Sequence, residues 1–172
     1  MKSSADIWGM DRLHELEIDL LVKERRWLEK IDETGLNKLI RKAVFITLET
    51  VHPVIGGPGE ICIVLSNDAH VRKLNRHWRQ IDSPTNVLSF PQIEPFAPVC
   101  GMLGDIIVSL ETIENEAKST QIPFFDHLSH LIVHGFAHIL GYDHQNDKEA
   151  EEMESLEVKI LSRLEIANPY VD

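Results

Sequence analysis

The segment from Phe124 to Leu140 is apolar on almost every side of a helical projection, and this constrains the fold more than any other part of the chain. A helix of this kind is stable only when other elements surround it, so we expect a buried central helix. Its four histidines fall within one stripe at about 100° per residue. They are His127, His130, His134 and His138.

Three histidines near the end of this helix form the pattern of a metal site. His134 and His138 are four residues apart, which places their imidazoles on one face, one turn apart. Gly141 marks the point where a helix ends and the chain can fold back, and His144 follows it. Three imidazoles with one open position are the ligand set of a catalytic zinc. We therefore predict that His134, His138 and His144 bind one Zn²⁺, which activates a water molecule for hydrolysis.

The other two histidines of the stripe are less suitable ligands. His127 and His134 are separated by about 10 Å along a helix axis, at a rise of ~1.5 Å per residue, which is too far for one ion. His130 and His134 form a competing pair, but His144 can be reached only from the C-terminal end of the helix. We interpret His127 and His130 as residues that support the ligands or fill the core.

The same spacing of histidines occurs in metzincin proteases, which contain H-E-x-x-H-x-x-G-x-x-H. Those enzymes use the Glu that follows the first His as a general base. Here that position is Gly135, which has no side chain. The pattern therefore predicts a metal site and disfavours peptide hydrolysis. Ordinary core and capping histidines are the alternative, and that alternative requires the spacing to be coincidental.

Two carboxylates are candidates to support this site. Asp143 precedes the third ligand, and it either accepts a ring N–H from a ligand histidine or simply shapes the turn after Gly141. Glu157 falls near the apolar arc of its helix, so it needs a partner. That partner is either a ligand histidine or a structural arginine, and we favour the structural pair.

Hydrophobic periodicity divides the chain into short strands and longer helices. We expect one compact α+β domain over 1–172, with a small mixed sheet of about four strands packed by about five helices, and with 1–12 as a loosely ordered N-terminal extension. The expected strands are 15–22, 61–65, 87–90 and 103–108. The expected helices are 34–50, a segment capped by 66–68 and ended by 82–85, 109–119, 124–140 and 147–164. The expected irregular segments are a turn cluster within 52–59 and a loop over 92–100.

Charge limits the partners of the protein. The net charge of −11 argues against broad coating of nucleic acid, yet the segment 70–80 contains no acid. Its basic side chains form a helical stripe that either contacts phosphates or is only solvated, while Trp78 is expected on the apolar face with Val71 and Leu74. The basic residues are Arg72, Lys73, Arg76 and Arg79.

Hydropathy and cysteine content predict where in the cell the protein is located. No apolar run approaches the ~20 residues of a membrane span, and the N-terminus lacks the apolar core of a signal peptide. Cys62 and Cys100 match no metal spacing and fit reduced thiols. We expect a cytoplasmic protein that contacts no membrane.

Three runs of the sequence, 74–91, 103–109 and 134–144, together resemble the YbeY family of bacterial endoribonucleases and rRNA maturation factors. The resemblance implies an α+β domain with Zn²⁺ on the three histidines. It also implies cleavage of single-stranded RNA in rRNA processing, including small-subunit rRNA 3′-end formation, and a role in ribosome quality control. The functional arginine of the family maps onto Arg79.

The implied partners are rRNA precursors and ribosomal subunits, with ribosomal or assembly proteins as further partners and no DNA. Two positions depart from the family pattern: Asn86 stands where many members have Asp, and Ala137 where Leu is usual. We therefore expect a zinc-dependent endoribonuclease in which Arg79 stabilises developing charge and Arg72, Lys73 and Arg76 contact RNA. The sequence contains no evident general base. The alternative is a non-catalytic ribosome assembly factor with a structural zinc.

Overall fold

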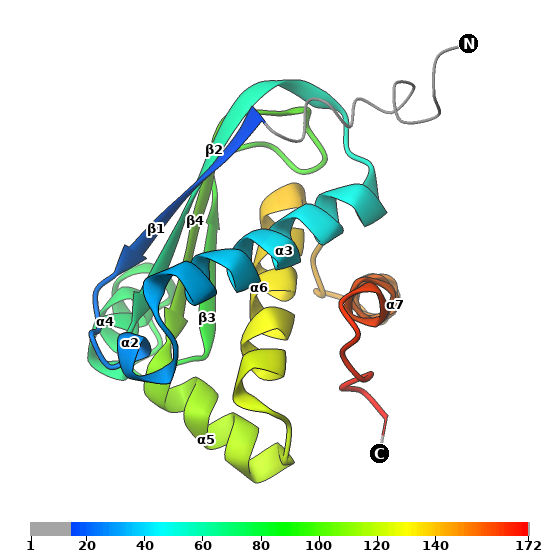
Figure 1. Ribbon diagram of the computed structural model, residues 1–172. Coiled ribbons are helices and arrows are strands. Elements are labelled where there is room, and N and C mark those ends of the chain that lie inside the picture. The colour runs from blue at the N-terminus through cyan, green and yellow to red at the C-terminus, as the bar shows by residue number, and fades with distance from the viewer. Residues whose placement is uncertain (1–14, 172) are drawn as a thin grey trace.

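The computed structural model describes residues 15–171, so the predicted N-terminal extension over 1–12 lies outside the described residues. Within this range the chain forms one four-stranded sheet and six helices, consistent with the expected α+β class (Figure 1). The strands are β1 (Leu16–Val22), β2 (Ile55–Ser66), β3 (Val87–Pro91) and β4 (Val99–Ser109). The helices are α2 (Trp27–Lys30), α3 (Glu33–Val51), α4 (Asp68–Arg79), α5 (Leu110–Thr120), α6 (Phe124–Leu140) and α7 (Asp147–Arg163).

The sheet is mixed, as predicted, with the strand order β1-β2-β4-β3. β1 pairs with β2 and β2 with β4 in parallel, whereas β3 runs antiparallel to β4. The parallel strands are connected through helices because a parallel pair cannot be joined by a tight turn. β3 is an edge strand, and this leaves one side of it available to line a cleft.

Alternate residues of the strands face two different layers. On one face Ile63 and Ile106 join the main core, which is covered by α3 and α6. On the other face Val64 and Ile107 pack with Val71 of α4 in a smaller cluster. Figure 1 shows α3 and α6 lying across one side of the sheet, with α7 on the far side of α6.

α6 lies between the sheet and α7, which explains its apolar sequence (Figure 1). Phe136 and Ile132 are fully buried, and the helix contacts β3, β4, α3, α5 and α7. Because nearly every side of α6 is covered, its histidines lie at the edge of a rigid, densely packed core.

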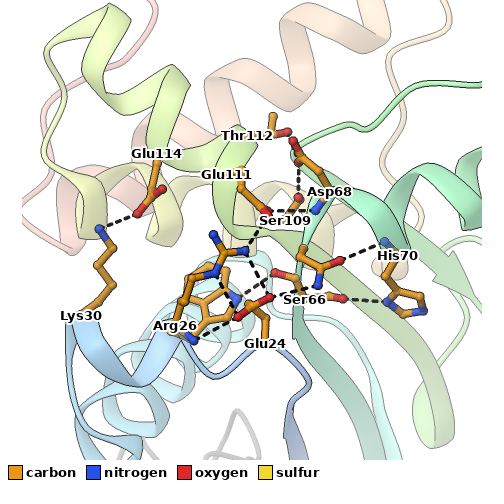
Figure 2. Close-up of polar contacts among 12 residues, drawn as sticks. Glu24, Arg26, Lys30, Ser66, Asp68, His70, Ser109, Glu111, Thr112 and Glu114 are labelled. Atoms are coloured by element: carbon orange, nitrogen blue, oxygen red, sulfur yellow. Dashed lines mark hydrogen bonds and ion pairs between the residues drawn. The ribbon is translucent and has the colours of Figure 1, made fainter.

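A polar network joins the carboxyl ends of β1, β2 and β4 to the helices that follow them (Figure 2). Arg26 bridges Glu24 and Glu111, with Nη2 2.7 Å from Glu111 Oε1. Asp68 accepts hydrogen bonds from Thr112 Oγ1 at 2.6 Å and Ser109 Oγ at 2.5 Å. These contacts fix the starts of α4 and α5 against the sheet.

Three segments differ from the sequence-based expectation. The loop predicted over 92–100 is shorter, because β4 already begins at Val99, where Ile55 pairs with it. α2 is a single turn, too short to show a period, and is stabilised by Trp27, which is fully buried and donates from Nε1 to Ser66 O at 2.9 Å. The glycine-rich segment 56–59 was predicted as a turn cluster, and this is wrong, because it forms the first part of β2. Pairing with β4 outweighs the low strand propensity of glycine, and the register shifts between Ile55 and Gly59.

Candidate metal centre

The three predicted histidines lie together at the C-terminal end of α6. One ligand nitrogen from each of His134, His138 and His144 lies within 4.8 Å of the others. The Nε2 atoms of His134 and His138 are 3.1 Å apart, and the ring centroids of His138 and His144 are 5.0 Å apart. Nitrogens that converge in this way are suitable ligands for one metal ion.

The turn between α6 and α7 places the third histidine. Gly141 ends α6 with a φ of 120°, and Tyr142 N donates back to Ala137 O at 3.1 Å. Asn146 then caps α7 by accepting a hydrogen bond from Glu149 N at 3.0 Å. His144 is held between these two helix ends, although its side chain is exposed.

The electrostatics of the site favour the neutral form of His138. Burial, together with the nearby His134 and His144, lowers the pKa of His138 to about 4. A neutral imidazole has a free lone pair, whereas a protonated one repels a cation. His138 is therefore ready to bind a metal at neutral pH.

Glu157 contacts the site directly, so our preference for a structural arginine partner was wrong. Its Oε1 lies 2.5 Å from Nδ1 of His134, and only 1% of the residue is exposed. Burial alone raises the pKa of Glu157, but His130, whose Nε2 lies 3.7 Å from Oε1, and the hydrogen-bonded His134 outweigh it and leave the pKa at about 2. The carboxylate therefore accepts the Nδ1–H of His134 and leaves Nε2 free as a ligand atom.

Asp143 shapes the turn before His144. Its Oδ1 accepts from His144 N and its Oδ2 from Gln145 Nε2, both at 2.8 Å. These bonds match the alternative in which Asp143 shapes the turn after Gly141. The carboxylate that hydrogen-bonds to the ring of the ligand His134 is that of Glu157.

A cleft of about 570 Å³ opens in front of the histidines. Its walls are formed by β3, the loop after it, the end of α6 and the turn to His144. Arg79, the last residue of α4, lines the same cleft, and its Nη1 lies 3.5 Å from Asn75 Oδ1. The fold thus brings Arg79 and the histidine triad together, although they are far apart in sequence.

The remaining basic residues of α4 line a different depression, together with Asp82. Arg72, Lys73 and Arg76 are all exposed, and Arg72 forms an ion pair there, with Nε 2.9 Å from Asp82 Oδ1. Trp78 was expected on the apolar face, but it is 62% exposed. Asn75 takes the inward position instead and donates from Nδ2 to Ser83 O at 2.9 Å.

Gly135 has a packing role at the position where metzincins have their base. A Cβ there would lie 3.1 Å from both Ile106 Cγ2 and Ser89 Oγ, so glycine lets α6 approach β3 and β4 without displacing these side chains. Ser89 Oγ also donates to Gly135 O at 3.0 Å. Position 135 faces the sheet, and glycine has no side chain that could act as a base.

No helix within 15–171 is long and apolar enough to cross a membrane. The fold and the site define an α+β protein with a three-histidine centre that can hold a metal ion in an open cleft. Residues 21–165 match the family model described as "Endoribonuclease YbeY". The chain therefore belongs to the YbeY family.

Curated relatives named "Endoribonuclease YbeY" cover most of the chain. The protein of Bradyrhizobium sp. strain BTAi1 is 47% identical over 82% of this chain and 86% of its own length. That of Sinorhizobium fredii is 44% identical over 91% of this chain and 93% of its own length. The solution structure of TM1509 from Thermotoga maritima is similar in fold, with a TM-score of 0.53 and 20% identity, covering 90% of this chain and 96% of that one.

Proposed function

We propose that this protein is a zinc-dependent endoribonuclease that cleaves single-stranded segments of rRNA precursors in the cytoplasm. The main observation that supports this proposal is that the histidine triad and Arg79 line one open cleft. His134, His138 and His144 would hold the ion, which when bound supplies Lewis acidity and an activated water for phosphodiester hydrolysis. Processing of the small-subunit rRNA 3′ end is the specific reaction that we assign.

The residues of the chain provide three further contributions. Arg79 brings a permanent positive charge to the cleft, where a guanidinium stabilises the extra charge of a phosphate in the transition state. Glu157 fixes the tautomer of His134. The turn from Gly141 holds His144 beside the helix.

Exposed aromatic rings at the rim of the cleft support an RNA substrate. Trp78 is adjacent to Arg79 and its ring lies 6.1 Å from that of Phe90, which lines the cleft. Phe96 is 66% exposed and packs edge-on against Tyr142 at 5.1 Å. Such rings stack on unpaired bases, so they favour single-stranded RNA over a duplex.

The openness of the site argues for catalysis over a purely structural metal. A structural zinc is closed by four protein ligands, whereas among the described residues the cluster contains three histidines. The three histidines line an open cleft of about 570 Å³, which would leave room for a substrate group beside a bound ion. A non-catalytic assembly factor with a structural zinc is the alternative that the experiment must exclude.

The test is cleavage of a single-stranded RNA by zinc-loaded protein, compared with His138→Ala, with the zinc content of both measured. We expect His138→Ala to lose both zinc and cleavage. His52→Asn is the matched control, because His52 is exposed at the end of α3 and Asn tolerates its left-handed backbone. Stoichiometric zinc in the wild type without cleavage above the His138→Ala background would establish the assembly-factor alternative.

A further inference from the structure

The chain that follows α7 returns to α6 and brings Tyr170 to the buried side of the metal centre. After α7 ends at Arg163, Ile166 N donates to Leu161 O at 2.9 Å and the Ile166 side chain packs against the main core. Tyr170 N then donates to Asn168 Oδ1 at 2.8 Å. The segment is therefore anchored to the core at Ile166 and turned locally by Asn168 before it reaches α6.

The hydroxyl of Tyr170 completes the hydrogen bonds of Glu157. Glu157 uses Oε1 for His134 Nδ1 and Oε2 for the Tyr170 hydroxyl. The single hydroxyl proton goes to the carboxylate, so the oxygen of Tyr170 accepts from His130 Nε2, which is 3.1 Å away. The ring of Tyr170 also stands edge-on to that of His130, with centroids 5.6 Å apart.

The geometry points to Tyr170 as a positioning residue of the metal centre, which acts by holding the Glu157 carboxylate in the orientation that His134 requires. This inference rests on the proposed metal binding by the triad. A carboxylate on a helix can rotate about its side-chain torsions, and a hydrogen bond to its second oxygen restricts this rotation and so orients the ligand histidine. The segment after α7 thereby becomes part of the site, although it contributes no metal ligand.

The exposure of Tyr170 indicates that its hydroxyl, rather than its ring, is the important group. The residue is 43% exposed, so its ring buries little apolar surface compared with a core aromatic. Glu157 is 1% exposed, and without Tyr170 its Oε2 loses the hydrogen bond that this buried carboxylate needs. Tyr170→Phe therefore removes the proposed function of the residue and keeps its ring contact with His130.

The experiment measures the zinc affinity of the full chain by competition with a chromophoric chelator. We expect Tyr170→Phe to bind zinc about tenfold more weakly, and Glu157→Gln to lose between about tenfold and 100-fold, as for other groups that orient ligand histidines. Val171→Ala is the matched control, because Val171 belongs to the same segment and is 68% exposed. Thermal unfolding of the zinc-free proteins, followed in parallel, reports any general loss of stability.

The double variant identifies the route of the effect. If Tyr170 acts through Glu157, Tyr170→Phe has little further effect on zinc affinity in a Glu157→Gln background. Unchanged affinity in Tyr170→Phe, or a loss of equal size in both backgrounds, would overturn the inference. A wild type that binds no more zinc than His138→Ala would instead refute the proposed metal site, so the two failures are distinguishable.

Discussion

Arg79 is the one Lys or Arg among the described residues that line the cleft. We predict that Arg79→Ala lowers the kcat of RNA cleavage roughly 100-fold without changing the zinc content, because a charge that acts on the transition state is lost. The kcat of Arg79→Lys should lie between those of the wild type and Arg79→Ala, since an ammonium keeps the charge but cannot bind phosphate in a bidentate manner. Steady-state cleavage assays with metal analysis test this.

Arg72→Ala is the comparison for that prediction. Arg72 belongs to the same helix, but it is paired with Asp82 in a separate depression. A reduction in kcat as large as that of Arg79→Ala would show that general loss of positive charge, and not a specific role of Arg79, causes the effect.

Asn86 carries an amide where many family members have a carboxylate, and its contact with Glu116 explains why an amide suits this position. Its Nδ2 donates to both carboxylate oxygens of Glu116, at 3.2 and 3.0 Å, and its Oδ1 accepts from Val87 N at 2.7 Å. Asn86→Asp would place two carboxylates in contact, so we predict a loss of about 1–2 kcal/mol in the free energy of unfolding at pH 7. Urea denaturation measures it, and adding Glu116→Gln should restore most of the loss. An Asn86→Asp protein as stable as the wild type would contradict this account.

At the scale of elements, the end of α6 decides where His144 lies. A Cβ on Gly141 would lie 2.6 Å from Phe96 N and 2.8 Å from Pro95 Cα, and the φ of 120° is itself unfavourable for other residues. We predict that Gly141→Ala costs about 1–3 kcal/mol of stability and also weakens zinc binding, because the turn must shift. Denaturant unfolding and zinc titration report the two effects.

Gly57→Ala is the matched glycine variant. A Cβ there would meet its nearest atom, Cys100 Cβ, at 3.8 Å, which is an ordinary contact. It should retain zinc affinity. Equal zinc affinity in Gly141→Ala and Gly57→Ala would show that the turn does not position His144.

The polar network of Figure 2 makes the junction between elements sensitive to acid. Hydrogen bonds from Arg26 and Asn67 lower the pKa of Glu24 from 4.5 to about 2. A carboxylate with a lowered pKa stabilises the fold above its unfolded pKa, and this contribution disappears as the pH falls from 4.5 towards 2. We predict that Glu24→Gln is less stable than the wild type by about 1 kcal/mol at pH 7, with solvent screening included.

Unfolding curves at several pH values test that assignment. The difference between Glu24→Gln and the wild type should shrink below pH 4.5. A difference that stays constant down to pH 2.5 would show that the ionisation of Glu24 does not contribute.

For the molecule as a whole, the net charge of −11 limits how RNA is held. With Arg72 already paired, Lys73, Arg76 and Arg79 are the Lys and Arg side chains of α4 left to meet phosphates. We predict a slope of only about −2 for log affinity against log salt concentration, at about −0.7 per contact with a single strand. Trp78→Ala should lower RNA affinity at every salt concentration without changing the slope, because stacking involves no counterions. A much steeper slope in the wild type would indicate a basic surface other than α4.

The arrangement of the molecule also shows why some site residues were predictable and others were not. Glu157 was marked by its place near an apolar arc, which indicates that a buried carboxylate needs a partner. The sequence left a ligand histidine and an arginine as alternatives, and only the packing of α7 against α6 selects His134. No sequence feature indicated a role for Tyr170. Its contact with Glu157 depends on how the segment after α7 folds back, which is a property of packing between distant segments.

Interactions within a few residues account for much of what was predicted correctly. The bounds of α6 follow from its apolar run, the shared face of His134 and His138 from helix periodicity, and the turn to His144 from Gly141. These features depend on backbone sterics and local hydrogen bonds, which the order of residues specifies directly. Contacts between distant segments determined the strand order, the pairing of 56–59 in β2 and the exposure of Trp78. They also bring Arg79 and Glu157 to the histidines. Local patterns cannot encode these, because the burial and pairing energies that select them arise only once the sheet and helices have packed together.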